Sequence, residues 1–228
     1  MKTAIVTGAS SGLGKLIAEE LDRNGYGIIN WSLDQGVDVR SIPSVAYAAS
    51  QIDGPIDVLV NCAGINGINF LQDVSEQEFD QIMDTNAKSI YVTAKILAER
   101  LRNGTILTIV SNAAHVPMTS SLAYNASKGA ALIMSKQLAR ELKKSHNVTC
   151  FSVSPNKLSG TGMSNYIDQR VCELRGWTPE EARAYQLAAL PAGDETPPEV
   201  LAEFIGFLLS KKERHFYLAG CDITYGGP

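Results

Sequence analysis

A tyrosine and a lysine, Tyr124 and Lys128, lie four residues apart in a stretch that the sequence predicts to be helical. Residues i and i+4 share one face of a helix, one turn apart. The lysine ammonium can therefore lie close to the phenol and lower the tyrosine pKa from its usual value of about 10. A tyrosine tuned in this way can act as a general acid or base near neutral pH. Because such pairs also occur by chance on helix surfaces, the interpretation depends on the rest of the chain.

A glycine-rich loop follows the first predicted strand, residues 2–7, and precedes a helical run over residues 15–24. A dinucleotide-binding loop needs this order, because the glycines let the backbone approach a pyrophosphate and the helix N-terminus supplies amide donors. The alternative is a plain strand-to-helix turn. The loop residues predicted to contact a cofactor are Gly8, Ser10, Ser11, Gly12, Leu13 and Gly14.

The composition of the 228-residue chain narrows the function classes. Hydrophobic residues make up 45% and charged residues 19%, and the net charge is −4. An acidic chain argues against a surface for nucleic acids or anionic membranes. The four cysteines lack the spacing of a zinc site, so no metal site is predicted. No signal-peptide pattern or membrane-length apolar run occurs, and we expect a cytoplasmic protein.

The elements around the Tyr–Lys pair alternate between strand and helix. Apolar, β-branched runs predict strands over residues 2–7, 27–32, 57–61, 105–110, 147–153 and 215–218. Helical spacing predicts helices over residues 15–24, 41–52, 75–101, 124–144 and 199–210. This alternation predicts an α/β fold with a Rossmann-like, doubly wound parallel sheet. No linker is visible, so residues 1–228 are expected to form a single domain.

Several motifs in this order resemble those of the short-chain dehydrogenase/reductase family. The glycine loop has the family spacing TGxxxGxG, and Asn61-Cys62-Ala63-Gly64 is similar to the family's Asn-Asn-Ala-Gly. Ser111 precedes Tyr124 by 13 positions (124 − 111), as in the family, and Pro155 is retained. The resemblance covers essentially the whole chain and implies hydride transfer between NAD or NADP and a carbonyl or secondary alcohol.

The resemblance also implies roles for the catalytic residues. Tyr124 would exchange the proton of the substrate oxygen, and Ser111 would hydrogen-bond that oxygen. Lys128 would lower the tyrosine pKa and hold the nicotinamide ribose. The backbone of Asn86 would hold a water that connects the lysine to solvent. Other positions implied to contact the cofactor are Ser32, Asp38, Val39, Asn61, Ala63, Gly64, Tyr124, Lys128, Pro155 and Thr161.

The cofactor-binding edge departs from the family pattern at three places. Ser32 stands where NAD enzymes of the family carry an acidic residue, although Asp34 could reach the ribose if the loop bends back. Lys15 and Arg40 are the nearest candidates for an NADP 2′-phosphate. These residues together favour NAD over NADP as the cofactor. The other two departures are Cys62 in place of asparagine, which puts one hydrogen bond in question, and Asn156 in place of glycine. The turn at Asn156 can be kept, since asparagine tolerates a left-handed backbone.

The substrate side is less patterned. The resemblance places a substrate lid over residues 158–191, and His115 lies near enough to Ser111 to contact a polar substrate, though it could equally have no role. The apolar residues of the 124–144 helix extend beyond one buried stripe, so a second packing surface is expected. This predicts a homodimer or homotetramer. Two other functions stay open: a non-catalytic dinucleotide sensor and an epimerase or dehydratase that retains NAD.

Overall fold

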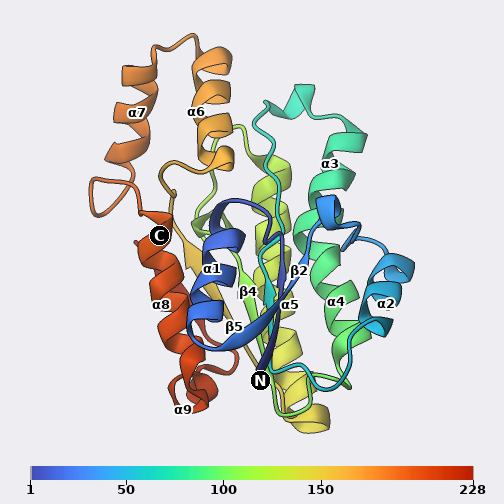
Figure 1. Cartoon of the computed structure of the whole chain (residues 1–228). Helices are drawn as coiled ribbons and strands as arrows, with labels where there is room; N and C mark the ends of the chain where they lie inside the picture. The colour runs from blue at the N-terminus through green and yellow to red at the C-terminus, as the bar shows by residue number, and fades with distance from the viewer. Residues whose placement is uncertain (1, 228) are drawn as a thin grey trace.

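A single six-stranded parallel sheet forms the centre of the computed structural model, which describes residues 2–227 (Figure 1). The strand order is β2-β1-β3-β4-β5-β6, so the chain moves outward from β1 first to one side and then to the other. This reversal defines a doubly wound sheet and confirms the predicted fold class. The strands are β1 (Lys2–Thr7), β2 (Tyr26–Trp31), β3 (Val58–Asn61), β4 (Thr105–Ile109), β5 (Thr149–Pro155) and β6 (Asp222–Tyr225).

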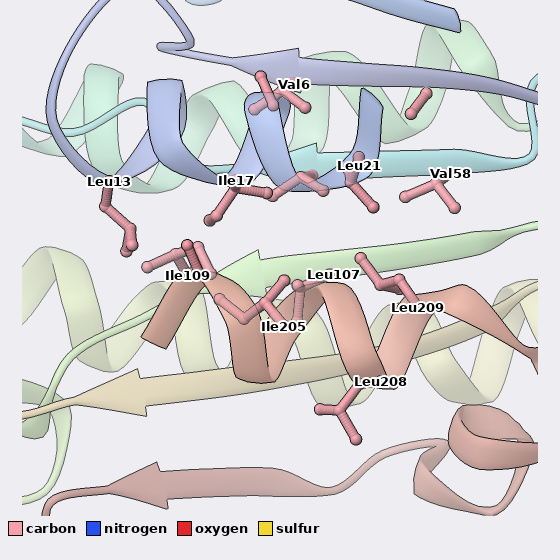
Figure 2. Close-up of a cluster of buried hydrophobic side chains, with 14 of the residues drawn as sticks. Val6, Leu13, Ile17, Leu21, Val58, Leu107, Ile109, Ile205, Leu208 and Leu209 are labelled. Atoms are coloured by element: carbon pink, nitrogen blue, oxygen red, sulfur yellow. The ribbon is translucent and has the colours of Figure 1, made fainter. Parts of the chain in front are cut away.

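Two apolar cores lie on opposite faces of this sheet. On one face, α1 (Gly12–Arg23) packs beside α8 (Pro198–Ser210), and Ile17, Leu21 and Ile205 are fully buried against the strands (Figure 2). Each such side chain contributes about 1.5–3 kcal/mol on burial. The opposite face is covered by α2 (Ile42–Ser50), α4 (Ser89–Leu97) and α5 (Leu122–His146). The strands are therefore held rigidly, and their ends are fixed in space.

The helix predicted over residues 75–101 is interrupted. It begins where expected, because the Ser75 hydroxyl accepts a hydrogen bond from the amide of Glu78 at 3.1 Å. It then consists of α3 (Glu76–Met83), a π-helical turn (Asp84–Lys88) and α4, which ends four residues early at Leu97. One wide turn in a helix is a frequent feature of functional sites.

The prediction of a last strand over residues 215–218 is wrong. Residues 212–218 form a short helix, α9 (Lys212–His215), and a 3₁₀ turn, and the strand β6 comes afterwards at Asp222–Tyr225. The aromatic run suggested a strand, but Tyr217 is 86% exposed, whereas Ile223 and Tyr225 pack against the core. The strand predicted to start at Asn147 starts two residues later, because Asn147 ends α5 in a left-handed conformation (φ 56°).

The segment predicted as a lid contains two helices that project from the body of the protein (Figure 1). They are α6 (Gly162–Arg175) and α7 (Pro179–Ala188), and we call residues 162–188 the lid hairpin. The helix α7 begins after Thr178, which forms a capping box with Glu181. The whole of α6 was missed. None of the helices within residues 2–227 is long and apolar enough to cross a membrane.

Candidate active site

A cavity of about 860 Å³ opens where the parallel strands end. Its wall includes Gly8 after β1, Ser32 after β2, Ser111 after β4 and Pro155 at the end of β5. Ligands of open α/β sheets bind at this edge, where the strand order reverses. Fifteen of the predicted site residues border the cavity: Gly8, Ser11, Gly12, Leu13, Gly14, Ser32, Asp38, Val39, Ala63, Gly64, Ser111, Tyr124, Lys128, Pro155 and Thr161.

Tyr124 and Ser111 meet inside this cavity. Ser111 lies two residues after the end of β4, and its Oγ accepts a hydrogen bond from the amide of Ala113 at 3.1 Å, which fixes the rotamer. The Tyr124 side chain extends from the first turn of α5 and is 8% exposed. The Ser111 hydroxyl lies close enough to the Tyr124 phenol to oppose, in part, the rise in the pKa of that phenol. A carbonyl oxygen placed at this pair would therefore find two hydroxyl groups.

Lys128 lies one turn further along α5. Its Nζ donates a hydrogen bond to the carbonyl of Ile109 at 3.0 Å and lies 5.8 Å from the centroid of the Tyr124 ring. Burial disfavours the ammonium and lowers the pKa of Lys128 to about 8. The Ile109 contact orients the ammonium so that it borders both the tyrosine and the cavity.

The predicted direction of the Tyr124 shift is wrong. Burial raises the pKa of the phenol above its ordinary value, and the hydrogen bond from Ser111 opposes that rise only in part. The reasoning from the sequence counted the attraction of Lys128 but not the removal of the phenol from water. In a buried site the loss of hydration acts against the charged form of either group, so both side chains are pushed toward neutrality.

Asn86 lies in the π-helical turn and does not border the cavity. Its carboxamide oxygen accepts from the amide of Ile65 at 2.8 Å, and its amide donates to the Ile65 carbonyl and to Ser127 Oγ, each at 2.9 Å. The side chain is thus fully engaged in joining the loop after β3 to α5. Asn86 acts on the site by holding the elements that carry the lysine and the loop.

The glycine loop has the shape that a dinucleotide needs. A side chain at Gly14 would lie 2.3 Å from the carbonyl oxygen of Gly8, and one at Gly8 would lie 2.9 Å from the Cα of Ala63. The N-cap residue Ser11 makes no side-chain hydrogen bond to the first turn of α1, and that turn carries no acidic residue. The first amides of α1 therefore face the cavity as donors for an anion, which fits a pyrophosphate.

Three predicted cofactor contacts on this edge lie outside the cavity wall: Ser10, Asp34 and Asn61. Asn61 is turned into the core, where its oxygen accepts from Thr93 Oγ1 at 2.9 Å. Ser10 instead donates to Asp34 at 2.6 Å, so the loop after β2 does bend back onto the glycine loop. Hydrogen bonding to Ser10 lowers the pKa of Asp34, which keeps its carboxylate charged.

Arg40 and Asp38 occupy the cavity wall near the adenosine end. The Arg40 guanidinium donates to both carboxylate oxygens of Asp38, each at 2.9 Å. Those hydrogen bonds hold the pKa of Asp38 below its usual value. The cation that could have faced an NADP phosphate is thus already paired. Lys15 lies on α1 in a long ion pair with Glu19 (3.8 Å) and does not border the cavity.

Asn156 and Thr161 connect the site to the lid hairpin. Asn156 does not use the left-handed backbone that asparagine would tolerate here, because its φ is not positive. Instead its carboxamide accepts from Thr196 Oγ1 at 2.6 Å and donates to the Gly226 carbonyl at 3.2 Å. Thr161 caps α6 by accepting from the Ser164 amide at 3.1 Å, and it borders the cavity.

His115 is directed away from the cavity, contrary to its suggested substrate contact. Its Nε2 lies 2.9 Å from an oxygen of Asp222 and 3.3 Å from Ser154 Oγ. Both partners belong to the outer strands, and Ser152 donates to the same carboxylate at 2.5 Å. This cluster ties the loop after β4 to β6 and gives the histidine a structural role.

One set of cavity residues was missed from the sequence. Four apolar side chains of α6 follow helical spacing and border the cavity: Met163, Ile167, Val171 and Leu174. The signal was present, since apolar residues at i, i+4, i+8 and i+11 follow the N-cap Thr161. The polar residues between them hid the pattern. Arg175 and Tyr185 of the lid hairpin border the same cavity.

Comparisons with known proteins agree with this architecture. Residues 31–171 match the family described as short chain dehydrogenase. The chain is 30% identical to the 3-oxoacyl-[acyl-carrier-protein] reductase FabG of Vibrio cholerae serotype O1 over 249 residues, covering 99% of this chain and 96% of the relative. The chain belongs to the short-chain dehydrogenase/reductase family. This short-chain dehydrogenase is therefore an oxidoreductase that uses NAD or NADP.

Other known proteins are similar to this chain over almost its full length. The (3R)-3-hydroxyacyl-CoA dehydrogenase of Canis lupus familiaris is 26% identical, with 98% of this chain and 95% of the relative covered. The structure of aldohexose dehydrogenase from Thermoplasma acidophilum is 26% identical, has a TM-score of 0.84 and covers 99% of this chain and 93% of its own. An actinorhodin polyketide ketoreductase with NADPH (TM-score 0.87, 23% identical, 99% and 96% covered) shares the fold. Relatives named as reductases and dehydrogenases do not favour the sensor or the epimerase and dehydratase alternatives for this short-chain dehydrogenase.

Proposed function

We propose that Tyr124, Ser111 and Lys128 carry out the oxidation or reduction of a small carbonyl or alcohol compound, with Asn86 as a positioning residue. The observation that carries the proposal is that all three side chains border one cavity together with the glycine loop. Tyr124 and Lys128 lie one turn apart on α5, whereas Ser111 follows β4 and reaches the same cavity only through the fold. The bound nicotinamide supplies the hydride chemistry.

The protein's own groups handle the proton and the charge on the substrate oxygen. Tyr124, kept protonated by burial, donates its proton to that oxygen during reduction and is left as a phenolate; in the oxidation direction that phenolate takes the proton back from the alcohol. Ser111 hydrogen-bonds the same oxygen and stabilises the charge that develops there. Lys128 would hold the ribose hydroxyls of the nicotinamide half, and its positive charge would stabilise the phenolate that forms when Tyr124 gives up its proton. Asn86 keeps the loop after β3 and α5 at a fixed separation.

The cofactor is proposed to be NAD. Asp34 accepts a hydrogen bond from Ser10, which places a carboxylate against the glycine loop, just outside the cavity wall. A carboxylate favours ribose hydroxyls and repels a 2′-phosphate. Arg40, the nearest cation on the cavity wall, is paired with Asp38. The gluconate dehydrogenase-like and sorbose reductase structures similar to this chain were solved with NADP and NADPH, so this preference needs its own measurement.

The quaternary structure is proposed to be a homodimer or homotetramer. Tyr91 on α4 and Ile133 on α5 are 46% and 64% exposed, on two of the three helices that cover one face of the sheet. A second copy of the chain would bury this apolar surface. Sedimentation at micromolar concentration tests the proposal, and an exclusively monomeric protein would contradict it.

The remaining proposals concern the chain as a whole. It forms one domain, in which residues 158–191 cover the substrate. A cytoplasmic location remains a prediction from the sequence. That the protein binds neither nucleic acid nor membranes remains a prediction from the composition and net charge.

The test of the proposed function is consumption of reduced cofactor in the presence of carbonyl compounds. NADH and NADPH are each offered with ketones, aldoses and 3-oxoacyl thioesters, and absorbance of the reduced cofactor is followed. We expect carbonyl-dependent oxidation of the cofactor with at least one class. Tight cofactor binding without turnover on any class, in either direction, would overturn the proposal.

A further inference from the structure

Arg175 differs from the other cationic side chains of the lid region. Residues 157–195 contain four such side chains. Three of them form ion pairs with carboxylates: Lys157, Arg170 and Arg183. Arg175 has neither a carboxylate partner nor a hydrogen-bond acceptor anywhere in residues 2–227, although it is half-buried. A guanidinium that gives up water without gaining a partner costs free energy, so its position needs an explanation.

Two aromatic rings hold the Arg175 guanidinium in place. Its Cζ lies 4.8 Å from the centroid of Trp177 and 5.1 Å from that of Tyr185, and the two rings meet edge to face at 5.1 Å. Stacking on aromatic faces orients the guanidinium plane and leaves its N–H groups free to donate. Arg175 and Tyr185 both border the cavity. The lid hairpin thus presents a fixed cation to the space in front of Tyr124.

An apolar path connects this cation to the reaction site. Met163, Ile167, Val171 and Leu174 lie on one stripe of α6, and all of them border the cavity. At about 1.5 Å of rise per residue, α6 carries Arg175 about 20 Å from the end of the helix that borders the cofactor region. An apolar chain along this stripe would be removed from water over its whole length.

We propose that Arg175 binds the anionic end, a carboxylate or a phosphate, of a substrate whose apolar body lies along α6 and whose carbonyl or alcohol reaches Tyr124. The planar fork of arginine matches the two oxygens of either anion. The proposal rests on the proposed function for the position of the reacting carbon. It adds the substrate class: elongated, apolar in the middle and negatively charged at the end remote from the hydride transfer.

The test measures binding rather than turnover, using the full-length protein. Octanoate, octyl phosphate and octan-1-ol are titrated into the protein by calorimetry, with Trp177 fluorescence as a second signal. We expect at least one of the two anions to bind about tenfold or more tightly than the alcohol, as charge-assisted hydrogen bonds allow. Arg175→Gln is expected to remove that preference and to leave the affinity for octan-1-ol within about twofold.

Arg183→Gln is the matched control, because Arg183 also lies on the hairpin but is paired with acidic residues and does not border the cavity. It should retain the full preference for anions. Equal affinity for octan-1-ol and both anions, no saturable anion binding, or an unchanged preference in Arg175→Gln would each overturn the proposal. Octan-1-ol binding shows that the variant still folds.

Failure of this inference can be told apart from failure of the proposed function. Tyr124→Phe should lose turnover but keep the preference for anions. If turnover depends on Tyr124 and the anion preference is missing, only the role of Arg175 falls. If a ketone is turned over, Arg175→Gln should raise the KM of its carboxylated analogue about tenfold with little change in kcat, whereas the KM of the neutral ketone should stay constant.

Discussion

The reaction site and the lid hairpin are built in different ways. Ser111, Tyr124 and Lys128 are each less than 10% exposed and belong to elements buried on the central sheet. In the lid hairpin only Ser164 of α6 and Ala182 of α7 are buried. The hairpin is held at its base by Lys157, which pairs with Asp168 and with Glu195 (2.8 Å).

This difference separates chemistry from substrate choice. Proton transfer requires groups fixed to within a fraction of an ångström, and a buried sheet edge supplies that precision. Substrate entry requires an element that can open, and a hairpin with few buried apolar contacts opens at low cost. Substitutions in the two regions should therefore affect different quantities: turnover in the first, and binding or local opening in the second.

The largest effect should come from Tyr124→Phe. Loss of the phenolic proton donor should lower kcat by about a thousandfold or more, in the range of general acid–base contributions. Cofactor affinity should stay within about threefold, since one hydroxyl is lost and the shape of the cavity is kept. Steady-state kinetics and cofactor titration check both statements. A variant with near-normal kcat would mean that another group transfers the proton.

Lys128→Met should lower kcat/KM about a hundredfold and at the same time stabilise the fold. Burial lowers the pKa of Lys128 to about 8, below its unfolded value, so at pH 7 the folded protein bears the cost of a buried ammonium. Replacing it should raise the free energy of unfolding by about 1–3 kcal/mol at pH 7, measured in urea.

The same shift predicts a dependence on pH. The wild-type protein should gain stability as the pH rises from about 8, where folded Lys128 loses its proton, until the unfolded lysine titrates near 10.4. The Met variant should lack this particular rise. If the free energy of unfolding rises equally with pH in the two proteins, the charged form of Lys128 is not destabilised in the folded state.

A change at the base of the hairpin should act on opening instead of chemistry. Lys157→Met leaves the carboxylates of Asp168 and Glu195 without their shared cation, and the Glu195 side chain is only 6% exposed. Amide exchange over residues 162–188 should become about tenfold faster, while exchange in α5 stays unchanged. Arg183→Gln, which removes only long contacts of 3.6 Å, should change exchange by less than about twofold. Faster exchange in α5 as well would remove the distinction between the two regions.

The smallest effect is expected at the adenosine end. Asp34→Asn keeps the hydrogen bond with Ser10 and removes the charge. The ratio of kcat/KM for NADH to that for NADPH should fall by about fivefold, because the 2′-phosphate no longer meets a carboxylate. Ser32→Ala serves as a control without a charge change. A ratio that does not move would place the cofactor preference elsewhere on the cavity wall.

The sequence by itself determined the parallel sheet, the glycine loop and the spacing of Ser111, Tyr124 and Lys128. These features follow from local periodicity and from residues close in the chain, such as the i and i+4 relation on one helix. The polar residues of α6 concealed an apolar stripe of the same kind. The aromatic residues at 216 and 217 suggested a strand, but their neighbours place them in a short exposed turn.

Only the tertiary structure decided where several polar side chains point. His115 turns to Asp222, 107 residues away, and Asn156 bonds to Thr196 and Gly226 instead of forming a left-handed turn. The sign of the Tyr124 pKa shift was decided in the same way, since burial raises the pKa and the hydrogen bond with Ser111 opposes that rise only in part. Hydrogen bonds and desolvation depend on which atoms surround a group in space, and most of those atoms come from elements far along the chain.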